Sequence, residues 1–443
     1  MSEPDGRQPV AVPARARRAG ERSDQWSWTE PTVWTERMLT ALEQGVKGGK
    51  WYSLWDKVHA EATLRAAFAQ VAANKGAAGV DHVSIKQFAD DLEANLKRLS
   101  DGLRTGSYQP QAIRRHYIPK PGSAEKRPLG IPTVRDRVVQ TALRMVLEPI
   151  FEQDFAAQSY GFRPGRGCKD ALRRVDGLLN AGYAHIVDVD LKSYFDSIPK
   201  DRLLALIGQK VTDGRALDLI ASFLEQRVMD GTKEWTPEQG TPQGAVISPL
   251  LSNIYLDPLD HLMAERGFEM VRYADDFVVL CRSKQDAVAA LAEVQQWTAQ
   301  AGLTLHPTKT RLVDAREDGF DFLGYRFEDG TRRPRDKSLK KFKDTIRAKT
   351  RRTSGDSLDQ IIVDINRTLR GWFEYFKHSH PRTFGKLDGW VRRRVRSILR
   401  KRRGSYGIAR GSDNRRWPNA LFAKQGLFSL HIAFAQVRQS SCR

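Results

Sequence analysis

Apolar residues along the first three quarters of the chain fall into two patterns, short continuous runs and longer stretches with helical spacing. Residues 185–191 form a short apolar run that predicts a buried strand, and residues 268–283 form two such runs around an acidic turn. Residues 134–154 and 284–302 have the spacing of helices. Strands interleaved with helices indicate an α/β or α+β body.

The N-terminal part of the chain predicts helices followed by a hairpin. Residues 1–25 are rich in Pro, Arg and Gly without periodicity, so we expect a disordered leader. Helices are expected at residues 51–73 and 85–103, and a hairpin with basic residues at its tip is expected at residues 114–133. Five tryptophans in residues 26–55 suit either core packing or stacking on RNA bases, and the sequence leaves both open.

The last quarter of the chain changes to amphipathic helices. Apolar residues within 361–376 are spaced 4, 4, 3 and 4 apart, and those within 384–398 are spaced 3, 4, 4 and 3 apart. This spacing places the apolar side chains on one face of each helix. A third, basic helix is expected at residues 338–352.

Positive charge is concentrated in the same region. The chain carries 73 Lys and Arg residues against 53 Asp and Glu residues, a net charge of +20. Residues 331–443 hold 30 basic and 8 acidic residues, whereas the first 330 residues have a net charge of −2. Because charge that only aids solubility would be spread evenly, this clustering indicates a polyanionic partner, most simply nucleic acid.

The cysteine content and the hydropathy exclude several classes of protein. Cys168, Cys281 and Cys442 are too few for a disulfide framework or a zinc site with four cysteine ligands. We therefore expect a reducing compartment. No uncharged apolar run approaches the roughly 18 residues that a membrane-spanning helix needs.

Three carboxylates are predicted to meet at the end of the sheet. Asp275 and Asp276 lie at the turn between two apolar strands, and Asp190 ends another apolar strand that can lie alongside them. Adjacent carboxylates repel each other in an apolar setting unless a cation offsets their charge. Oxygen ligands suit Mg²⁺ or Mn²⁺, and two such ions can stabilise the attacking and leaving oxygens of a phosphoryl transfer. A solvated β-turn is the alternative explanation for the Asp pair.

Seven motifs in a fixed order indicate a family. They are KRPLGIPT, YGFRPGRG, VDLKSYFDSI, QGTPQGAVISPLLSNIYL, VRYADDFVVL, GLTLHPTKT and DFLGYRF. In residues and order they closely resemble the reverse transcriptases encoded by bacterial group II introns. NRTLRGWFEYFKHS and FGKLDGWVRRRVRSILRKR resemble the maturase, or thumb, domain of that family, and RWPNALFAKQGLFSL resembles its C-terminal tail. The resemblance covers residues 51–429.

The resemblance implies an α+β fold of the right-hand polymerase type. Such a fold has fingers, a palm built on an antiparallel sheet, and an α-helical thumb or maturase domain. The implied parts after the leader are an N-terminal extension with the start of the fingers at residues 26–84, fingers at 85–180, a palm with a minor fingers contribution at 181–330, a thumb at 331–405, and a basic C-terminal tail, read as a DNA-binding remnant, at 406–443.

The resemblance also implies a catalytic site. Asp190, Asp275 and Asp276 match the family's metal-binding triad, which would hold two Mg²⁺ ions with Mn²⁺ as a substitute, and the carbonyl of Leu191 is expected to help. Lys309 matches a lysine expected to protonate the leaving pyrophosphate.

A nucleotide pocket is implied beside the triad. Two basic residues of the fingers would contact the triphosphate, and the TPQG motif would line the pocket. One of two adjacent aromatic residues should pack under the sugar and exclude a 2′-hydroxyl, and the sequence leaves open which. The residues implied to contact the nucleotide are Lys120, Arg127, Tyr194, Phe195, Gln243 and Gly244.

Cationic residues of the 161–172 loop and the thumb are expected to grip nucleic acid through its phosphates, so binding should weaken steeply with salt. The residues expected to do so are Arg163, Arg166, Lys340, Lys341, Arg347, Arg370, Arg392, Arg393, Arg396, Arg400, Lys401 and Arg402.

The implied function is an RNA-directed DNA polymerase that also binds its group II intron RNA and assists splicing and retrohoming. A primer 3′-hydroxyl would attack the α-phosphate of a dNTP, and pyrophosphate would leave. The implied partners are intron RNA, an RNA template with a DNA primer, target DNA and dNTP, without a membrane, in the nucleoid-associated cytoplasm of a bacterium. The sequence leaves the cognate intron and the oligomeric state open.

Two alternative functions stay open at this point. One is an RNA-binding splicing cofactor with a dispensable polymerase, and the other is a domesticated reverse transcriptase used in defence or repair. The motifs also lack the Cys-paired HNH endonuclease pattern that many relatives carry, because Cys442 is the only cysteine after Cys281. We therefore expect the compact type without an endonuclease, which would take its primer from elsewhere, such as a nascent replication strand.

Overall fold

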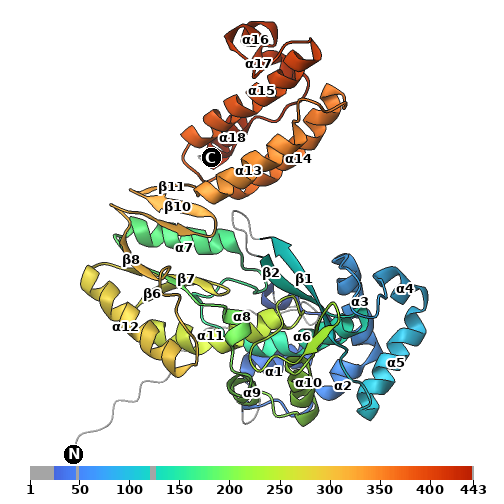
Figure 1. Cartoon of the computed structure of the whole chain (residues 1–443). Helices are drawn as coiled ribbons and strands as arrows, with labels where there is room; N and C mark the ends of the chain where they lie inside the picture. Colours follow the sequence, from blue (N-terminus) through green and yellow to red (C-terminus); the bar gives the residue numbers. More distant parts are fainter. Residues whose placement is uncertain (1–23, 46–48, 120–125, 442–443) are drawn as a thin grey trace, which may run out of the picture.

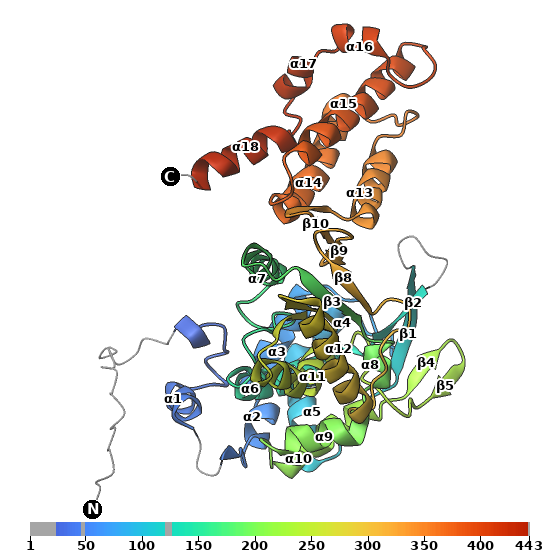
Figure 2. The same cartoon turned by 90° about the vertical axis from the view of Figure 1, so that its left-hand side faces the viewer.

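The computed structural model describes residues 24–45, 49–119 and 126–441. An α+β body carries a bundle of helices at its C-terminal end (Figure 1), and the view turned by 90° shows the same two parts (Figure 2). The predicted α+β class, with antiparallel sheets followed by a helical domain, is confirmed. Within the described ranges, no helix is both long enough and apolar enough to cross a membrane.

Short helices build the N-terminal part of the body. The helix predicted at residues 51–73 is interrupted at Ala60, whose ψ of 131° is not helical. The helix predicted at residues 85–103 is interrupted at Asp91, whose φ of −128° and ψ of 46° leave the helical region. The elements are η1 (Asp24–Trp26), α1 (Glu36–Gln44), α2 (Trp55–His59), α3 (Glu61–Ala73), α4 (Ile85–Asp90) and α5 (Leu92–Thr105).

Two of the N-terminal tryptophans belong to the hydrophobic core. Trp26 and Trp34 are fully buried. The indole Nε1 of Trp34 donates a hydrogen bond to the carbonyl of Met145, at 3.0 Å, which satisfies its polar atom inside the core. Trp26 and Trp34 are therefore packing residues and cannot stack on RNA bases.

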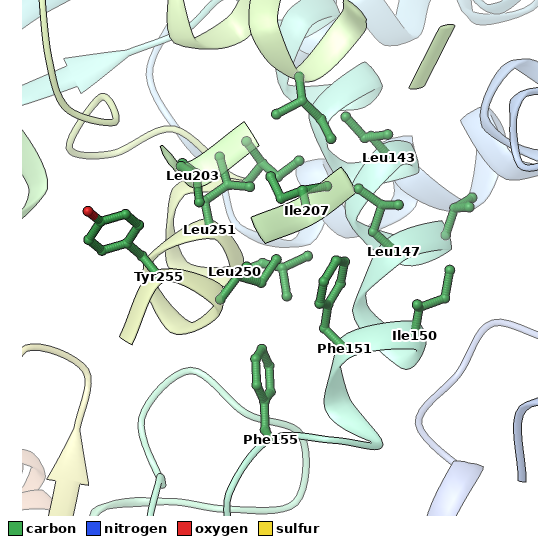
Figure 3. Packing of buried hydrophobic residues seen from close by; sticks show 14 of the residues in the cluster. Leu143, Leu147, Ile150, Phe151, Phe155, Leu203, Ile207, Leu250, Leu251 and Tyr255 are labelled. Atoms are coloured by element: carbon green, nitrogen blue, oxygen red, sulfur yellow. The ribbon is translucent and has the colours of Figure 1, made fainter. Parts of the chain in front are cut away.

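The centre of the largest core is α6 (Val134–Glu152). Its apolar residues show no single face because it is buried on most sides. Figure 3 shows Leu147 and Phe151 of α6 facing Ile207 of α9 (Lys200–Gly208) and Leu250 of α11 (Ser248–Glu265). Each such side chain contributes about 1.5–3 kcal/mol through burial.

One carboxylate of α6, that of Glu148, is largely buried. Burial raises the pKa of Glu148 to about 7; the nearby Arg144 lowers it and Glu152 raises it. In the unfolded chain the group ionises at its ordinary, lower pKa. Between those two pKa values the unfolded state binds fewer protons, so stability is full at low pH and is lost as the pH rises toward 7.

The palm sheet has the strand order β6–β7–β3–β8 and is antiparallel throughout. Alternate residues of each strand enter different cores: Ile186 packs with α7 (Cys168–Asn180), whereas Val187 packs in the core that contains residues of α12 (Lys284–Gln300). Helices therefore cover both faces of the sheet. The strands are β3 (His185–Asp190), β6 (Glu269–Tyr273), β7 (Asp276–Cys281) and β8 (Arg311–Asp314).

The predicted hairpin near residue 120 lies in a second sheet, with the order β2–β1–β4–β5. Strand β1 pairs antiparallel with β2 and parallel with β4, so a segment over 100 residues downstream extends the sheet. The strands are β1 (Ile113–Pro119), β2 (Lys126–Ile131), β4 (Val228–Asp230) and β5 (Lys233–Trp235). The helices α8 (Tyr194–Ser197) and α10 (Gly214–Leu224) lie in the chain between β3 and β4.

A small antiparallel sheet lies between the palm and the helical bundle (Figure 2). Its strands are β9 (Phe320–Phe322), β10 (Tyr325–Glu328) and β11 (Thr331–Pro334). The predicted palm boundary at residue 330 falls inside the β10–β11 hairpin. The bundle that follows contains α13 (Asp336–Lys349), α14 (Leu358–Phe376), α15 (Arg382–Arg402), α16 (Gly411–Arg416), α17 (Asn419–Lys424) and α18 (Leu430–Ser441).

The segment predicted as a separate tail belongs in part to this bundle. Phe422, Leu430 and Ala433 share one hydrophobic core with Phe384 and Leu387 of α15. The apolar residues of α17 and α18 are packed against helices that precede them in the chain. The part of the segment that contains α17 and α18 therefore packs with the bundle.

Candidate active site

The strand register brings the predicted carboxylates to one edge of the palm sheet. Asp190 is the last residue of β3 and Asp276 is the first residue of β7, and the two are partners in the antiparallel pair. Asp275 precedes Asp276 in the turn from β6. Residues far apart in sequence therefore lie side by side because β3 pairs with β7.

The turn that carries the Asp pair has an unusual backbone. Ala274 has a φ of 60°, which a residue with a side chain adopts only at a cost of about 1–2 kcal/mol. Gly161 lies directly against it: a Cβ added to Gly161 would lie 2.2 Å from the amide nitrogen of Ala274. This contact leaves no room for any other residue at position 161.

A buried ion pair, which the sequence reasoning missed, supports the same turn. Arg272 and Asp260 are both fully buried, and Nε of Arg272 donates to Oδ1 of Asp260 at 2.7 Å while Nη2 donates to Oδ2. Nη1 donates to the carbonyl of Ala274 and to Oδ1 of Asn253, each at 2.9 Å. Asn253 in turn donates to the carbonyl of Gly161 at 2.9 Å. The arginine within the apolar strand of VRYADD is the feature of the sequence that could have indicated this ion pair.

Negative charge is crowded at this edge. Burial among protein atoms, followed by the charges of Asp188 and Asp275, raises the pKa of Asp276 to about 7, although part of the residue remains open to solvent. Burial also raises the pKa of Asp275, and the charge of Asp190 adds to the effect. Arg335 lowers the pKa of Asp276 and was not predicted as a site residue. Because burial and neighbouring negative charges destabilise the ionised form of these carboxylates, a cation beside them would stabilise it.

Lys309 lies beside the triad. Its Nζ is 2.8 Å from Oδ2 of Asp190, and the loop that carries it is tied to β3 by the amide of His306, which donates to the Asp190 carbonyl at 2.7 Å. Leu191, the predicted carbonyl ligand, follows Asp190 and is buried. Among the residues that the structure describes, no three His, Cys, Asp or Glu side chains converge closely enough to hold a metal ion. The Asp190 carboxylate is turned toward Lys309 instead.

The residues predicted for the nucleotide pocket have the following surroundings. Arg127 lies in β2, and its positive charge lowers the pKa of Asp275. Gln243 donates through Nε2 to Asp196 at 3.2 Å. Gly244 has a φ of 103°, and a Cβ there would lie 2.4 Å from the carbonyl oxygen of Gly130, so the TPQG backbone packs directly on β2. The predicted Lys120 lies outside the described residues.

The two adjacent aromatic residues have different environments. Tyr194 is buried, and its hydroxyl donates to the carbonyl of Ser252 at 2.7 Å, so it is a core residue. Phe195 is only partly buried, and its ring meets that of Tyr194 edge-on at 5.5 Å. Its carbonyl accepts a hydrogen bond from the amide of Thr241 in the TPQG loop, at 2.7 Å. Phe195 is therefore the more accessible of the two aromatic residues, whereas Tyr194 is enclosed in the core.

Two of the arginines predicted to bind nucleic acid are buried. Arg163 is 6% exposed; it forms an ion pair with Glu152 and donates to the carbonyls of Ala156 and Ser159. All of its nitrogens are engaged, so the expectation that it binds phosphate is corrected: it holds the loop that contains it. Arg396 is 5% exposed and lies inside the bundle.

The other predicted cations are at least partly exposed. Arg400 is tied to Asp413 at 3.0 Å, and Arg370 lies over the ring of Phe428, so both also support the bundle. The residues of this group with exposed positions are Arg166, Lys340, Lys341, Arg347, Arg370, Arg393, Lys401 and Arg402, whereas Arg392 and Arg400 are half-buried.

Two families match the chain in the regions just described. The family described as "Reverse transcriptase (RNA-dependent DNA polymerase)" matches residues 118–327, which include the carboxylate triad. The family described as "Group II intron, maturase-specific domain" matches residues 339–417, which cover most of the helical bundle.

Individual proteins match as well. Protein YkfC of Escherichia coli (strain K12) is 33% identical over 342 residues, which is 68% of this chain and 85% of YkfC. The group II intron-encoded protein LtrA of Lactococcus lactis subsp. cremoris is 38% identical over 204 residues, 45% of this chain but only 33% of LtrA. A solved structure titled "Partial Cas6-RT-Cas1--Cas2 complex" aligns over 56% of this chain and 41% of its own, at 24% identity and a TM-score of 0.36.

Proposed function

Because the chain belongs to the family of group II intron reverse transcriptases and maturases, we propose that it is an RNA-directed DNA polymerase that also binds intron RNA. The observation that carries this proposal is the pairing of β3 with β7, which places Asp190 opposite Asp276, with Asp275 next in the chain and Lys309 in contact with Asp190. The two alternatives left open by the sequence gain no support from the similarities.

The triad would hold two Mg²⁺ ions, with the carbonyl of Leu191 as a further ligand and Mn²⁺ as a substitute. The fit rests on the donor chemistry: all donors are oxygens, and burial and mutual repulsion raise the pKa values of Asp275 and Asp276. When bound, the ions supply charge stabilisation at the attacking and leaving oxygens of the phosphoryl transfer.

The protein's own groups position the reactants. Arg127 would bind the triphosphate, because its charge already acts on Asp275 at the triad. Phe195 would pack under the sugar and exclude a 2′-hydroxyl. Lys309 would give the proton on Nζ to the leaving pyrophosphate. The contact of Nζ with Asp190 supports this role, because it places the proton donor beside the triad. Positioning and electrostatics contribute most of the catalysis in such transfers.

The cationic bundle would bind the intron RNA and the template–primer duplex. With 30 basic and 8 acidic residues in the last 113 residues, this part of the chain is suited to phosphate contacts. Assistance to splicing and retrohoming, contact with target DNA and a nucleoid-associated cytoplasmic location are parts of the same proposal.

Primer extension on an RNA template tests the polymerase. With dNTP and Mg²⁺, the unaltered protein should extend a DNA primer, and the Asp275→Ala/Asp276→Ala variant should not. A matched control is Asp90→Ala/Asp91→Ala, which removes another adjacent, exposed pair of carboxylates, at the α4–α5 junction. The proposal is wrong if the unaltered protein binds RNA tightly yet extends no primer.

A further inference from the structure

A basic groove lies between the first two thirds of α15 and residues 409–419, which contain α16 and lead into α17. Its volume is about 760 Å³, within the range of roughly 300–1,000 Å³ typical of ligand pockets. The cations that line it are Lys386, Arg392, Arg393, Arg396 and Arg410, and no acidic residue lines it. The charge of the groove therefore favours an anion.

Arg396 places a buried positive charge in the wall of this groove. Its side chain is 5% exposed, and Nε donates to the carbonyl of Trp417 at 2.8 Å while Nη2 donates to Oδ1 of Asn419 at 2.7 Å. The guanidinium also lies 5.1 Å from the centre of the Phe422 ring. Within the described part of the chain, Arg396 has no carboxylate at ion-pair distance, and its Nη1 has no hydrogen-bond partner.

A buried charge without a counter-ion is unfavourable, and an anionic ligand offsets that cost. Nearby carboxylates are already engaged: Asp413 binds Arg400, and Asp388 accepts from Ser429 and from the amide of Leu430. Neither carboxylate forms an ion pair with Arg396, although the charge of Asp413 raises its pKa, so the groove keeps an excess of positive charge that an anionic ligand would offset.

Glycines keep the groove open. Gly385 and Gly389 lie one turn apart on α15, and Gly411 lies on the opposite wall. A Cβ added at any of the three would meet no atom within 4 Å, so these positions border free space. Larger side chains at 385 and 389 would project into the space that a ligand needs.

We propose that this groove binds one nucleotide of an RNA strand, with its phosphate held by Arg396 and by Arg393 at the rim. Asn419 accepts from Arg396 through Oδ1, so its amide NH₂ is left to donate, and Asn414 lines the same groove. Such amides can bind a 2′-hydroxyl, which distinguishes RNA from DNA. The inference rests on the proposed function, since RNA binding by the bundle is part of it.

Filling the groove tests the proposal without removing any charge. In Gly389→Leu the new side chain occupies the open space, and leucine favours a helix more than glycine does, so folding is retained. Gly371→Leu is the matched control, because Gly371 is an exposed helical glycine of α14 with free space around its Cβ, outside the groove. The probe is a fluorescein-labelled RNA hairpin, followed by fluorescence anisotropy, beside the DNA hairpin of the same sequence.

We expect Gly389→Leu to weaken RNA binding by about tenfold, the equivalent of about 1.4 kcal/mol, and to affect the DNA hairpin less. Gly371→Leu should bind like the unaltered protein. Arg393→Ala should reduce the slope of log K against log [salt] by ~0.7, as expected for the loss of one phosphate contact with a single strand. Lys97→Ala, which removes an exposed cation of α5, should leave the slope unchanged.

Three results would overturn the proposal: RNA affinity unchanged in Gly389→Leu, an equal loss for the RNA and DNA hairpins, or release of the RNA hairpin by millimolar inorganic phosphate, which would show a site for free anions. Failure of the proposed function looks different. In that case the unaltered protein itself would neither extend a primer nor bind the RNA hairpin. If it does both and Gly389→Leu matches it, only the groove assignment fails.

Discussion

Variants of the buried Arg272–Asp260 ion pair can distinguish its contribution to stability from its contribution to the position of the turn that carries Asp275 and Asp276. The variants are Asp260→Leu, Arg272→Met and the combination of the two. Both side chains are fully buried, so removing one partner leaves an uncompensated charge and should lower the free energy of unfolding by about 3–5 kcal/mol. Replacing both by apolar residues should recover part of that loss, because no buried charge remains, while the larger leucine at position 260 must be accommodated in a packed core.

Polymerase activity should not recover with stability. In the double variant the carbonyl of Ala274 and Oδ1 of Asn253 both lose their donor, Nη1 of Arg272, which lies 2.9 Å from each. Ala274 then keeps its φ of 60° without that support, and the turn that carries Asp275 and Asp276 can shift. A displacement of about 1 Å at a reacting centre lowers the rate on the order of 100-fold.

The assays are urea unfolding followed by circular dichroism, and single-turnover primer extension. The matched control replaces the surface pair Arg65–Glu93, whose exposed charges stay hydrated when one partner is lost and should change stability little. The reasoning is refuted if the double variant regains the full extension rate, or if the single variants at the buried pair are as mild as those at the surface pair.

Three other changes have defined outcomes. Gly161→Ala places a Cβ 2.2 Å from the Ala274 amide, so the turn must move and the primer-extension rate should fall on the order of 100-fold. Glu148→Gln cannot ionise, so its gain in unfolding free energy over the unaltered protein should grow from pH 5 to pH 8, toward about 3 kcal/mol. Phe195→Ala should lower the preference for dNTP over rNTP at least about tenfold, measured as the ratio of kcat/KM values.

Each change has a matched control. Gly177→Ala, on a helix with free space, should keep the extension rate. Glu61→Gln makes the same substitution at an exposed position and serves as the comparison. Tyr194→Phe should keep the dNTP preference while losing about 1 kcal/mol of stability with its hydrogen bond to Ser252. An unchanged extension rate in Gly161→Ala would contradict the argument about the turn. A stability gain independent of pH in Glu148→Gln would contradict the argument about the raised pKa, and an unchanged dNTP preference in Phe195→Ala would contradict the argument about the sugar.

Local periodicity located the secondary structure of this protein well. The strand predicted at residues 185–191 is β3, the helix at residues 284–302 is α12, and the helix at residues 361–376 is α14, each within a few residues. Such patterns persist because each element packs one face or both faces against a core. The helix predicted at residues 85–103 failed only at Asp91, where the chain bends between two helices.

Part of the chemistry of the site could also be predicted from the sequence. Adjacent carboxylates between apolar strands predicted an oxygen-donor cluster, and the order of motifs identified the family. The sequence did not separate Tyr194 from Phe195, because both are aromatic and only burial distinguishes them. It also assigned Arg163 to nucleic acid, because an arginine in a Gly-rich loop does not reveal its partner Glu152.

The sequence by itself therefore determined most of the elements and the family, and it predicted the carboxylates of the site, since these depend on the order and spacing of residues. Tertiary structure alone decided that Asp190 stands opposite Asp276, that Arg272 reaches Asp260, and that Arg396 is buried beside an open groove. Each of those facts depends on contacts between segments distant in sequence, and such contacts are set by how whole elements pack rather than by any local pattern.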